Sequence, residues 1–277
     1  VKYGKELDIN ANGPEIGKEK IEELLEKLKG LRNGDFLVLA GSVPPSLPDD
    51  LYSKILEMLE GKGVNVVVDT TGNQLLNVLK YKPFLIKPNH HELSEIFGEE
   101  MDTTEKITVY AKKLKEMGAK NVLVSRGGDG ALLIDEYGKV YPKDAVKGKL
   151  ISSVGCGDSM VAGFIAGYIK SRDYGEALKL SVASSAATAF SSELAKANEI
   201  YEMYKKAVDV VLNGYEVGSK QQPFYTYLSF YVKVMNNYDI KNGERTTAHK
   251  AYTQEALFYA EIAEKNFPTV LHFIKFR

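Results

Sequence analysis

A short glycine turn that ends in a carboxylate is the stretch of this chain best suited to chemistry. Gly155, Cys156, Gly157 and Asp158 lead directly into an apolar, helix-like segment that begins at Ser159. Backbone N–H groups at a helix start, with the positive end of the helix dipole, attract anions. An aspartate there repels a phosphate, but it can accept a proton from a nucleophile while the N–H groups hold a phosphoryl group. The turn therefore indicates phosphoryl transfer, with an ordinary helix N-cap as the structural alternative.

The composition limits which partners and compartments fit the chain. Its 277 residues are 44% hydrophobic and 26% charged, with a formal net charge of −1. These are globular values, and the small charge gives no general attraction to nucleic acid or to an anionic membrane. Cys156 is the single cysteine, which excludes an internal disulfide and favours a cytoplasmic protein. We expect no membrane-spanning segment and no signal peptide.

Helix-like and strand-like segments alternate from about residue 18 to residue 211. The helical pattern covers 19–29, 51–59, 74–79, 92–97, 104–117, 160–169 and 177–190, and the strand pattern covers 35–40, 64–69, 84–87, 121–125 and 131–134. Short apolar strands that alternate with helices predict an α/β fold with a mostly parallel sheet covered on both faces. Ligands bind such sheets at the carboxyl ends of the strands, and polar or glycine-rich motifs follow the predicted strands here.

The two ends of the chain depart from this alternation. Residues 1–13 have the pattern of a strand outside the main sheet, and we interpret them as part of a lid. Residues 212–277 are rich in tyrosine and phenylalanine at helical spacing, with Asn-Gly breaks at 213–214 and 242–243. They predict a helical C-terminal appendage, whose aromatic stripes could form an interface or a local core.

Five motifs in one order carry a family resemblance over residues 1–211. They are Gly41-Ser-Val-Pro-Pro-Ser-Leu-Pro48, Val68-Asp-Thr-Thr-Gly72, Lys87-Pro-Asn-His-His-Glu-Leu93, Val124-Ser-Arg-Gly-Gly-Asp-Gly-Ala131 and Ser153-Val-Gly-Cys-Gly-Asp-Ser-Met-Val-Ala-Gly163. Together they resemble the ribokinase-like PfkB sugar kinases, above all those that phosphorylate fructose 1-phosphate or tagatose 6-phosphate. The resemblance implies a three-layer ribokinase-like fold that binds ATP, Mg²⁺ and a sugar phosphate.

The same resemblance implies a role for each motif. Asp158 is the expected base for the sugar hydroxyl, and the N–H groups around Gly155, Cys156 and Gly157 are the expected anion hole. Ser42 is expected at the sugar phosphate, and Asn89 with Glu92 at Mg²⁺ and its waters. The expected ATP contacts are Lys87, Asn89, Ser125, Gly127, Gly130 and Ser184.

Several of these residues have structural interpretations that the sequence leaves open. Asn89 and Glu92 also form the pattern of a helix cap with a capping-box acid. The turn at residues 128–130 also fits a β-hairpin. Asp69 is equally a structural turn residue or a second acid beside the site. Adjacent side chains on a helix are expected to point apart, so His90 and His91 are interpreted as surface residues.

The resemblance favours an ATP-dependent kinase that converts fructose 1-phosphate to fructose 1,6-bisphosphate. Tagatose-6-phosphate kinase or another sugar kinase is the alternative within the family, and a catalytically incomplete nucleotide-binding remnant is the alternative outside it. Relatives carry an N-terminal section with a Gly-Gly sugar-binding element that this sequence does not contain. They often pair through their lids, so a homodimer is also expected.

Overall fold

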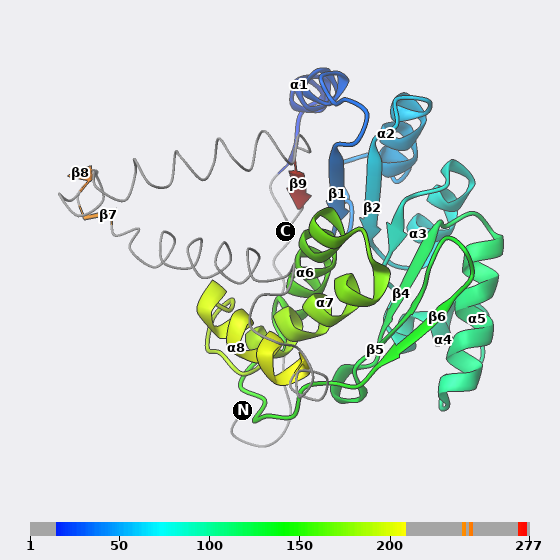
Figure 1. Cartoon of the computed structure of the whole chain (residues 1–277). Coiled ribbons are helices and arrows are strands. Elements are labelled where there is room, and N and C mark those ends of the chain that lie inside the picture. Colours follow the sequence, from blue (N-terminus) through cyan, green and yellow to red (C-terminus); the bar gives the residue numbers. More distant parts are fainter. Residues whose placement is uncertain (1–14, 209–239, 242–243, 246–270, 276–277) are drawn as a thin grey trace. The chain divides into compact units, whose positions relative to one another are not determined.

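The computed structural model (Figure 1) describes residues 15–208, 240–241, 244–245 and 271–275. The chain divides into two compact units: Lys5–Lys143 with Thr269–Arg277, and Val1–Gly4 with Asp144–Pro268. The predicted lid segment 1–13 and most of the predicted appendage 212–277 lie outside the described residues. The domain boundary at residue 211 therefore stays a prediction.

A mostly parallel sheet forms the centre of the first unit, as the sequence predicts. Its strands lie in the order β6-β5-β4-β3-β2-β1-β9. The neighbours from β4 through β3, β2 and β1 to β9 are parallel, and β5 pairs antiparallel with both β4 and β6. The bounds are β1 (Phe36–Ala40), β2 (Asn65–Asp69), β3 (Leu85–Ile86), β4 (Asn121–Ser125), β5 (Ala131–Ile134), β6 (Val140–Lys143) and β9 (Leu271–Lys275).

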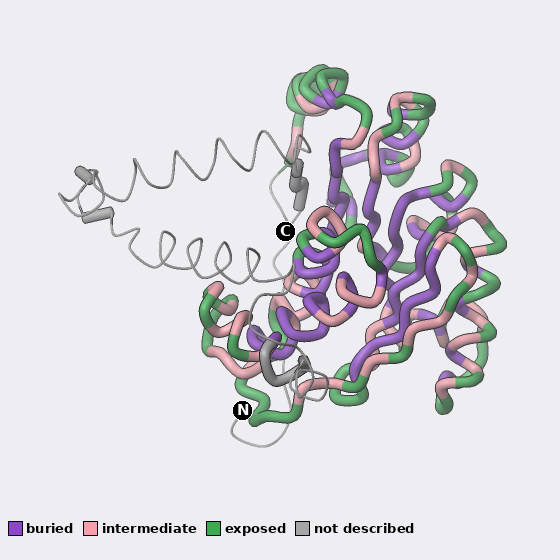
Figure 2. Tube along the Cα trace, viewed as in Figure 1, coloured by how far each residue is buried: buried purple, intermediate pink, exposed green. Residues whose placement is uncertain are grey.

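Five helices cover one face of this sheet through a continuous apolar core. They are α1 (Lys18–Lys29), α2 (Leu51–Leu59), α3 (Gly72–Val78), α4 (His90–Phe97) and α5 (Thr104–Glu116), with a short 3₁₀ turn, η1 (Leu79–Tyr81), after α3. Alternate strand residues such as Leu37, Val68 and Val122 point to the helices and are buried. The purple strands in Figure 2 show that β1, β4 and β5 are buried along their whole length or nearly so.

In its described residues, the second unit contains the helices α6 (Cys156–Ser171), α7 (Tyr174–Ala189) and α8 (Ala197–Val208). Small residues let α6 and α7 approach closely. A Cβ atom added to Gly163 would lie 2.7 Å from the carbonyl oxygen of Leu180, and one added to Gly167 would lie 2.7 Å from the Cα of Ala177. Side chains would therefore force the two helices apart at these positions.

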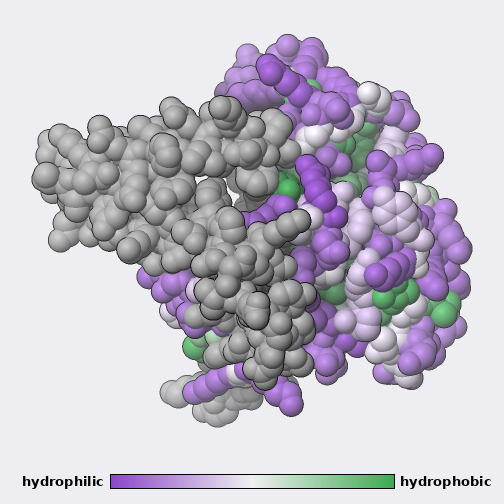
Figure 3. All heavy atoms as spheres, in the orientation of Figure 1, coloured by the Kyte–Doolittle hydropathy of each residue, from purple (hydrophilic) through white to green (hydrophobic). Residues whose placement is uncertain are grey.

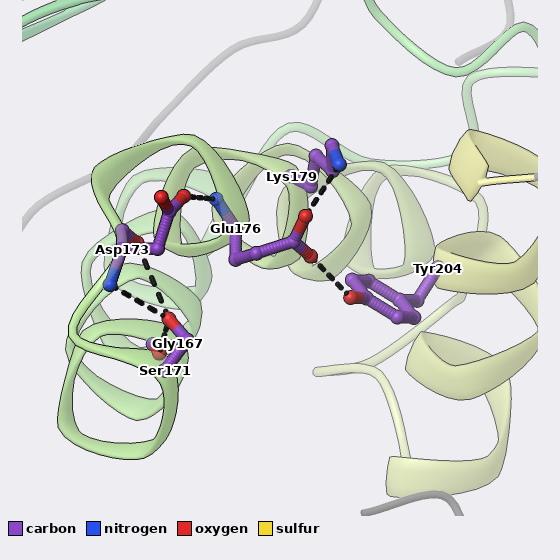
Figure 4. Close-up of polar contacts among 6 residues, drawn as sticks. All are labelled: Gly167, Ser171, Asp173, Glu176, Lys179 and Tyr204. Atoms are coloured by element: carbon purple, nitrogen blue, oxygen red, sulfur yellow. Dashed lines mark hydrogen bonds and ion pairs between the residues drawn. The ribbon is translucent and has the colours of Figure 1, made fainter. Parts of the chain in front are cut away.

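Polar contacts cap α7 and attach α8 to it (Figure 4). The Asp173 carboxylate accepts a hydrogen bond from the backbone N–H of Glu176, 2.8 Å away, and so caps α7. The Glu176 carboxylate forms an ion pair with Lys179 and accepts a hydrogen bond from the Tyr204 hydroxyl, 2.8 Å away. Tyr204 is buried, so α8, which the sequence analysis does not single out, is held by both packing and hydrogen bonding.

The described residues beyond position 211 are strands, so the prediction of helix is wrong for these residues. β7 (Ile240–Lys241) pairs with β8 (Glu244–Arg245), and β9 pairs in parallel with β1 from Phe36 to Ala40. For β9 the physical reason is that the open edge of β1 presents a row of backbone N–H and C=O groups with which another strand can pair. Among the described helices, none is both long and apolar enough to cross a membrane. The described residues visible in Figure 3, which are those drawn in colour, are mainly hydrophilic with small separate hydrophobic patches.

Candidate active site

The carboxyl ends of the parallel strands bring together most of the predicted site residues of the first unit. Ser42 follows β1 and is exposed, Asp69 ends β2, Lys87 follows β3, and Ser125 ends β4. Gly41 donates its N–H to the carbonyl oxygen of Asp69 at 2.9 Å, which extends the β1–β2 ladder to the turn. This edge is where an open parallel sheet presents ligand-binding groups.

Lys87 and Asp69 form a largely buried ion pair at this edge. The Lys87 Nζ lies 3.2 Å from the Asp69 Oδ1, and the two side chains are 8% and 18% exposed. A lysine removed from water needs a nearby negative charge or strong acceptors. Asp69, whose role the sequence leaves open, thus supplies the counter-charge to Lys87, and the pair lies at the strand ends where a phosphate is expected.

Asn89 and Glu92 form the capping box of α4. The Glu92 N–H donates to the Asn89 Oδ1, and the Asn89 N–H donates to the Glu92 Oε2, both at 2.8 Å. The pKa of Glu92 is raised above its ordinary value, mainly by burial and also by Asp69 and Glu95, against the lowering effects of its bond to Asn89 and the charge of Lys87. The structural interpretation of this motif is confirmed, and the metal role stays a prediction.

The donor set at this edge fits a hard cation that keeps most of its own waters. In the described part of the chain, no three His, Cys, Asp or Glu side chains cluster to form a closed metal cage. Mg²⁺ prefers oxygen ligands and is usually bound through one or two carboxylates together with substrate phosphates. The Glu92 carboxylate, which uses Oε2 for the cap, and the nearby Asp69 carboxylate meet that requirement.

His90 and His91 do not point apart as the helical spacing predicts. Their ring centroids are 3.9 Å apart with the planes tilted by 38°, and the His90 Nδ1 lies 3.4 Å from the carbonyl oxygen of Ser125. The prediction of separate directions is wrong because His90 is the first residue of α4, and its ring is drawn toward β4. His91 is exposed as expected, whereas His90 is half-buried.

The connection from β4 to β5 is a hairpin, as the structural alternative predicts. The two strands are antiparallel, and the Arg126 N–H donates to the carbonyl oxygen of Gly130 at 2.8 Å. Gly127 begins a short 3₁₀ turn, η2 (Gly127–Asp129), and both Gly127 and Gly130 have positive φ angles, 56° and 88°. Ser125 forms an isolated parallel bridge with Asn89, so the hairpin and the α4 cap are directly linked.

The second unit presents the glycine turn at the start of α6. Gly155 is the N-cap with φ of 78°, a left-handed conformation that suits glycine, and Asp158 lies in the first helical turn. The Ser159 N–H makes the helical bond to the Gly155 carbonyl oxygen at 2.9 Å, and the Cys156 N–H donates to the Ser153 carbonyl oxygen at 3.2 Å. The Cys156 N–H is therefore used within the turn, and the anion hole around Gly155, Cys156 and Gly157 stays a prediction.

The predicted adenine contact, Ser184, lies on α7, and its side chain faces Gly163 of α6. It is 3% exposed, and its hydroxyl donates to the carbonyl oxygen of Leu180 at 2.8 Å. Sequence reasoning did not predict the contacts of Thr188, whose hydroxyl lies 2.8 Å from that of Ser159 and accepts from the Ala195 N–H at 3.2 Å. Thr188 thus ties the first turn of α6 to α7. The signal that could have found it is a polar residue at a buried position of an Ala-rich helix.

Known proteins resemble this chain in both sequence and fold. The 1-phosphofructokinase of Bacillus subtilis (strain 168) is 50% identical over 194 residues, which are 70% of this chain and 64% of that protein. A D-tagatose-1-phosphate kinase of Bacillus licheniformis is 34% identical over 197 residues, which are 71% of this chain and 64% of that protein. The chain thus spans less than two thirds of the length of these relatives.

A solved structure and a family model extend the comparison. Phosphofructokinase-2 from Escherichia coli, solved in complex with substrates and products, matches with a TM-score of 0.69 and 25% identity over 74% of this chain and 68% of that chain. This likeness confirms the predicted ribokinase-like architecture. The model described as "pfkB family carbohydrate kinase" matches residues 1–200. The chain belongs to the pfkB family of carbohydrate kinases.

Proposed function

We propose that this chain carries the phosphoryl-transfer groups of an ATP-dependent sugar-phosphate kinase, and that its acceptor is the 6-hydroxyl of fructose 1-phosphate. The observation that carries the proposal is the start of α6, where a left-handed glycine leads into a first turn that holds a carboxylate. A base at that position accepts the hydroxyl proton, and the adjacent N–H groups stabilise the transferring phosphoryl group. The 50% identity to a 1-phosphofructokinase supports the choice of sugar.

The first unit contributes charge and positioning groups. The Lys87 ammonium, 3.2 Å from Asp69, contacts a phosphate of the nucleotide, while Ser42 binds the phosphate group of the sugar. Asn89 and Glu92 orient Mg²⁺ and its waters. Bound Mg²⁺ neutralises the charge of the nucleotide phosphates. Ser125, Gly127 and Gly130 on the β4–β5 connection lie along the nucleotide.

Two other functions are kept as alternatives. The relative named as a D-tagatose-1-phosphate kinase favours a second ketohexose phosphate, and tagatose 6-phosphate remains a further acceptor. Because the chain spans 64% of the length of its relatives, a catalytically incomplete protein that binds ATP without turnover is the alternative of another class.

Location and assembly follow the same proposal. We place the protein in the cytoplasm, where sugar phosphates and ATP are available, and we expect a homodimer. A solved structure described as a tetrameric inhibited form of phosphofructokinase-2 makes a larger assembly a second outcome. Size-exclusion chromatography with light scattering distinguishes these states.

The test is ADP release by the 277-residue chain with Mg²⁺–ATP and one sugar at a time. The sugars are fructose 1-phosphate, tagatose 1-phosphate and tagatose 6-phosphate, and a reaction without sugar measures ATP hydrolysis. Release that depends on fructose 1-phosphate and is lost in Asp158→Asn supports the proposal. Release with a tagatose phosphate alone changes the substrate. ATP binding without release of ADP under any condition supports the incomplete protein.

A further inference from the structure

Tyr52 fixes the backbone at the point where β1 ends. This residue lies on α2 with 1% of its surface exposed. Its hydroxyl oxygen lies 3.1 Å from the carbonyl oxygen of Ala40 and 3.0 Å from that of Gly41. Ala40 is the last residue of β1, and Gly41 has φ of 86°, so the single phenol proton is shared by two carbonyl groups where the chain turns out of the sheet.

Packing alone does not require this hydroxyl. A phenylalanine ring would fill the same apolar space, whereas a buried phenol needs a hydrogen-bond partner. Burial and the nearby charge of Asp69 raise the pKa of Tyr52 well above its ordinary value. The group therefore remains a proton donor throughout the physiological pH range, and the two carbonyl groups keep their partner.

Gln74 holds the other side of the same turn. Its Oε1 accepts a hydrogen bond from the Thr70 hydroxyl at 3.0 Å and lies 3.5 Å from the backbone N–H of Val43. The first distance lies within the usual range for a hydrogen bond, and the second is long. Ser42, which is exposed, thus lies between Gly41, held by Tyr52, and Val43, held more weakly by Gln74.

We propose that Tyr52, supported by Gln74, is a positioning residue that holds the Gly41–Val43 turn so that Ser42 receives the phosphate group of the sugar phosphate. This inference rests on the proposed function, because Ser42 is the proposed sugar-phosphate contact. Tyr52 acts through Ser42, so its loss weakens sugar-phosphate binding and leaves ATP binding unchanged. A purely structural role would lower the melting temperature and leave both affinities as they are.

The test is calorimetric titration of the folded 277-residue chain with fructose 1-phosphate and, separately, with ATP. Tyr52→Phe removes only the hydroxyl, and we expect about fivefold weaker binding of fructose 1-phosphate, the effect of one typical hydrogen bond. Gln74→Met, which keeps the side-chain length, is a second variant with a smaller expected effect. Tyr141→Phe is the matched control, since its hydroxyl donates to Asp135 at 3.0 Å, beside the β5–β6 turn at the opposite end of the strands.

A double-mutant cycle with Ser42→Ala shows whether Tyr52 acts through Ser42. We expect Tyr52→Phe to have no further effect on fructose 1-phosphate affinity once Ser42 is alanine. Equal affinity of the unaltered chain and Tyr52→Phe overturns the inference alone, as do effects that add in the cycle. Failure of the unaltered chain to bind fructose 1-phosphate overturns both the inference and the choice of substrate.

Discussion

Two substitutions of Glu92 separate its structural role from its proposed role at Mg²⁺. In the structure, the Glu92 Oε2 accepts the Asn89 N–H at 2.8 Å. Glu92→Gln retains a carbonyl oxygen for this bond and loses the charge, whereas Glu92→Ala loses both. Glu92→Gln therefore changes the charge alone, and the difference between the two variants isolates the cap.

The structure sets the expected size of each effect. Loss of one capping hydrogen bond costs about 1 kcal/mol, so Glu92→Ala should lower the melting temperature by about 2–4 °C for a domain of this size. Glu92→Gln keeps the bond and should not lower it. Both variants should raise the Mg²⁺ concentration for half-maximal ADP release, by roughly 10–100-fold, the usual effect of losing a group that orients a bound metal.

The pH dependence of Glu92 gives the sign of a further effect. Burial raises the pKa of this carboxyl in the folded protein, so the folded state binds the proton more tightly than the unfolded state does. Its contribution to stability is therefore present at low pH and is lost as the pH rises through the folded pKa. Between the unfolded and the folded pKa of Glu92, the melting temperature of Glu92→Gln should therefore rise relative to that of the unaltered chain.

Thermal unfolding and a Mg²⁺ titration of ADP release measure these effects on the same samples. The reasoning on the cap is refuted if Glu92→Gln is as destabilised as Glu92→Ala. The reasoning on the metal is refuted if Glu92→Gln has the Mg²⁺ requirement of the unaltered chain.

Three further substitutions test other parts of the structure. Asp158→Asn should reduce ADP release by roughly 10²–10⁴-fold, the usual contribution of a general base. Its affinity for ATP, measured by calorimetry, should be unchanged. A retained rate of ADP release would exclude Asp158 as the base. Gly163→Ala should lower the melting temperature, because the added Cβ would lie 2.5 Å from the Ser184 hydroxyl and 2.7 Å from the Leu180 carbonyl oxygen. Adding Ser184→Gly to the same chain should recover part of the loss. If the melting temperature does not recover, the contact between Gly163 and Ser184 is not its cause. Burial lowers the pKa of Lys170 to about 8, so its contribution to stability rises with pH above that value. The melting temperature of Lys170→Met should therefore exceed that of the unaltered chain near pH 7. A difference in melting temperature that stays constant up to pH 10 would contradict the burial argument.

Local patterns in the sequence predicted most of the fold because they are set by neighbouring residues. The apolar runs at 36–40 and 121–125 form buried strands, and the helix-like segment from Ser159 belongs to α6. The strand Leu271–Lys275 was not predicted, because its pairing with Phe36–Ala40 joins segments more than 200 residues apart. Its five residues carry no local signal that separates strand from helix.

The candidate site was predicted where its residues are close in sequence and missed where the sheet brings them together. The Asn89–Glu92 box is a spacing of three residues, which a sequence displays directly. The Lys87–Asp69 pair depends on β2 and β3 being neighbours that end at the same edge. A parallel sheet was expected, but its strand order was not, so Asp69 could not be assigned to Lys87.

Tyr52 shows which signal in a sequence points to such a long-range contact. Its neighbours Leu51, Ile55 and Leu56 are buried and apolar, and the pattern of this helix alone would accept phenylalanine at position 52. A tyrosine at the centre of an apolar helix face must place its hydroxyl against a polar group of another element. Here that group is the backbone that leads to Ser42. A buried tyrosine on an apolar helix face therefore indicates a polar contact with another element, and the contact made by Tyr52 holds the turn that carries the proposed contact to the sugar phosphate.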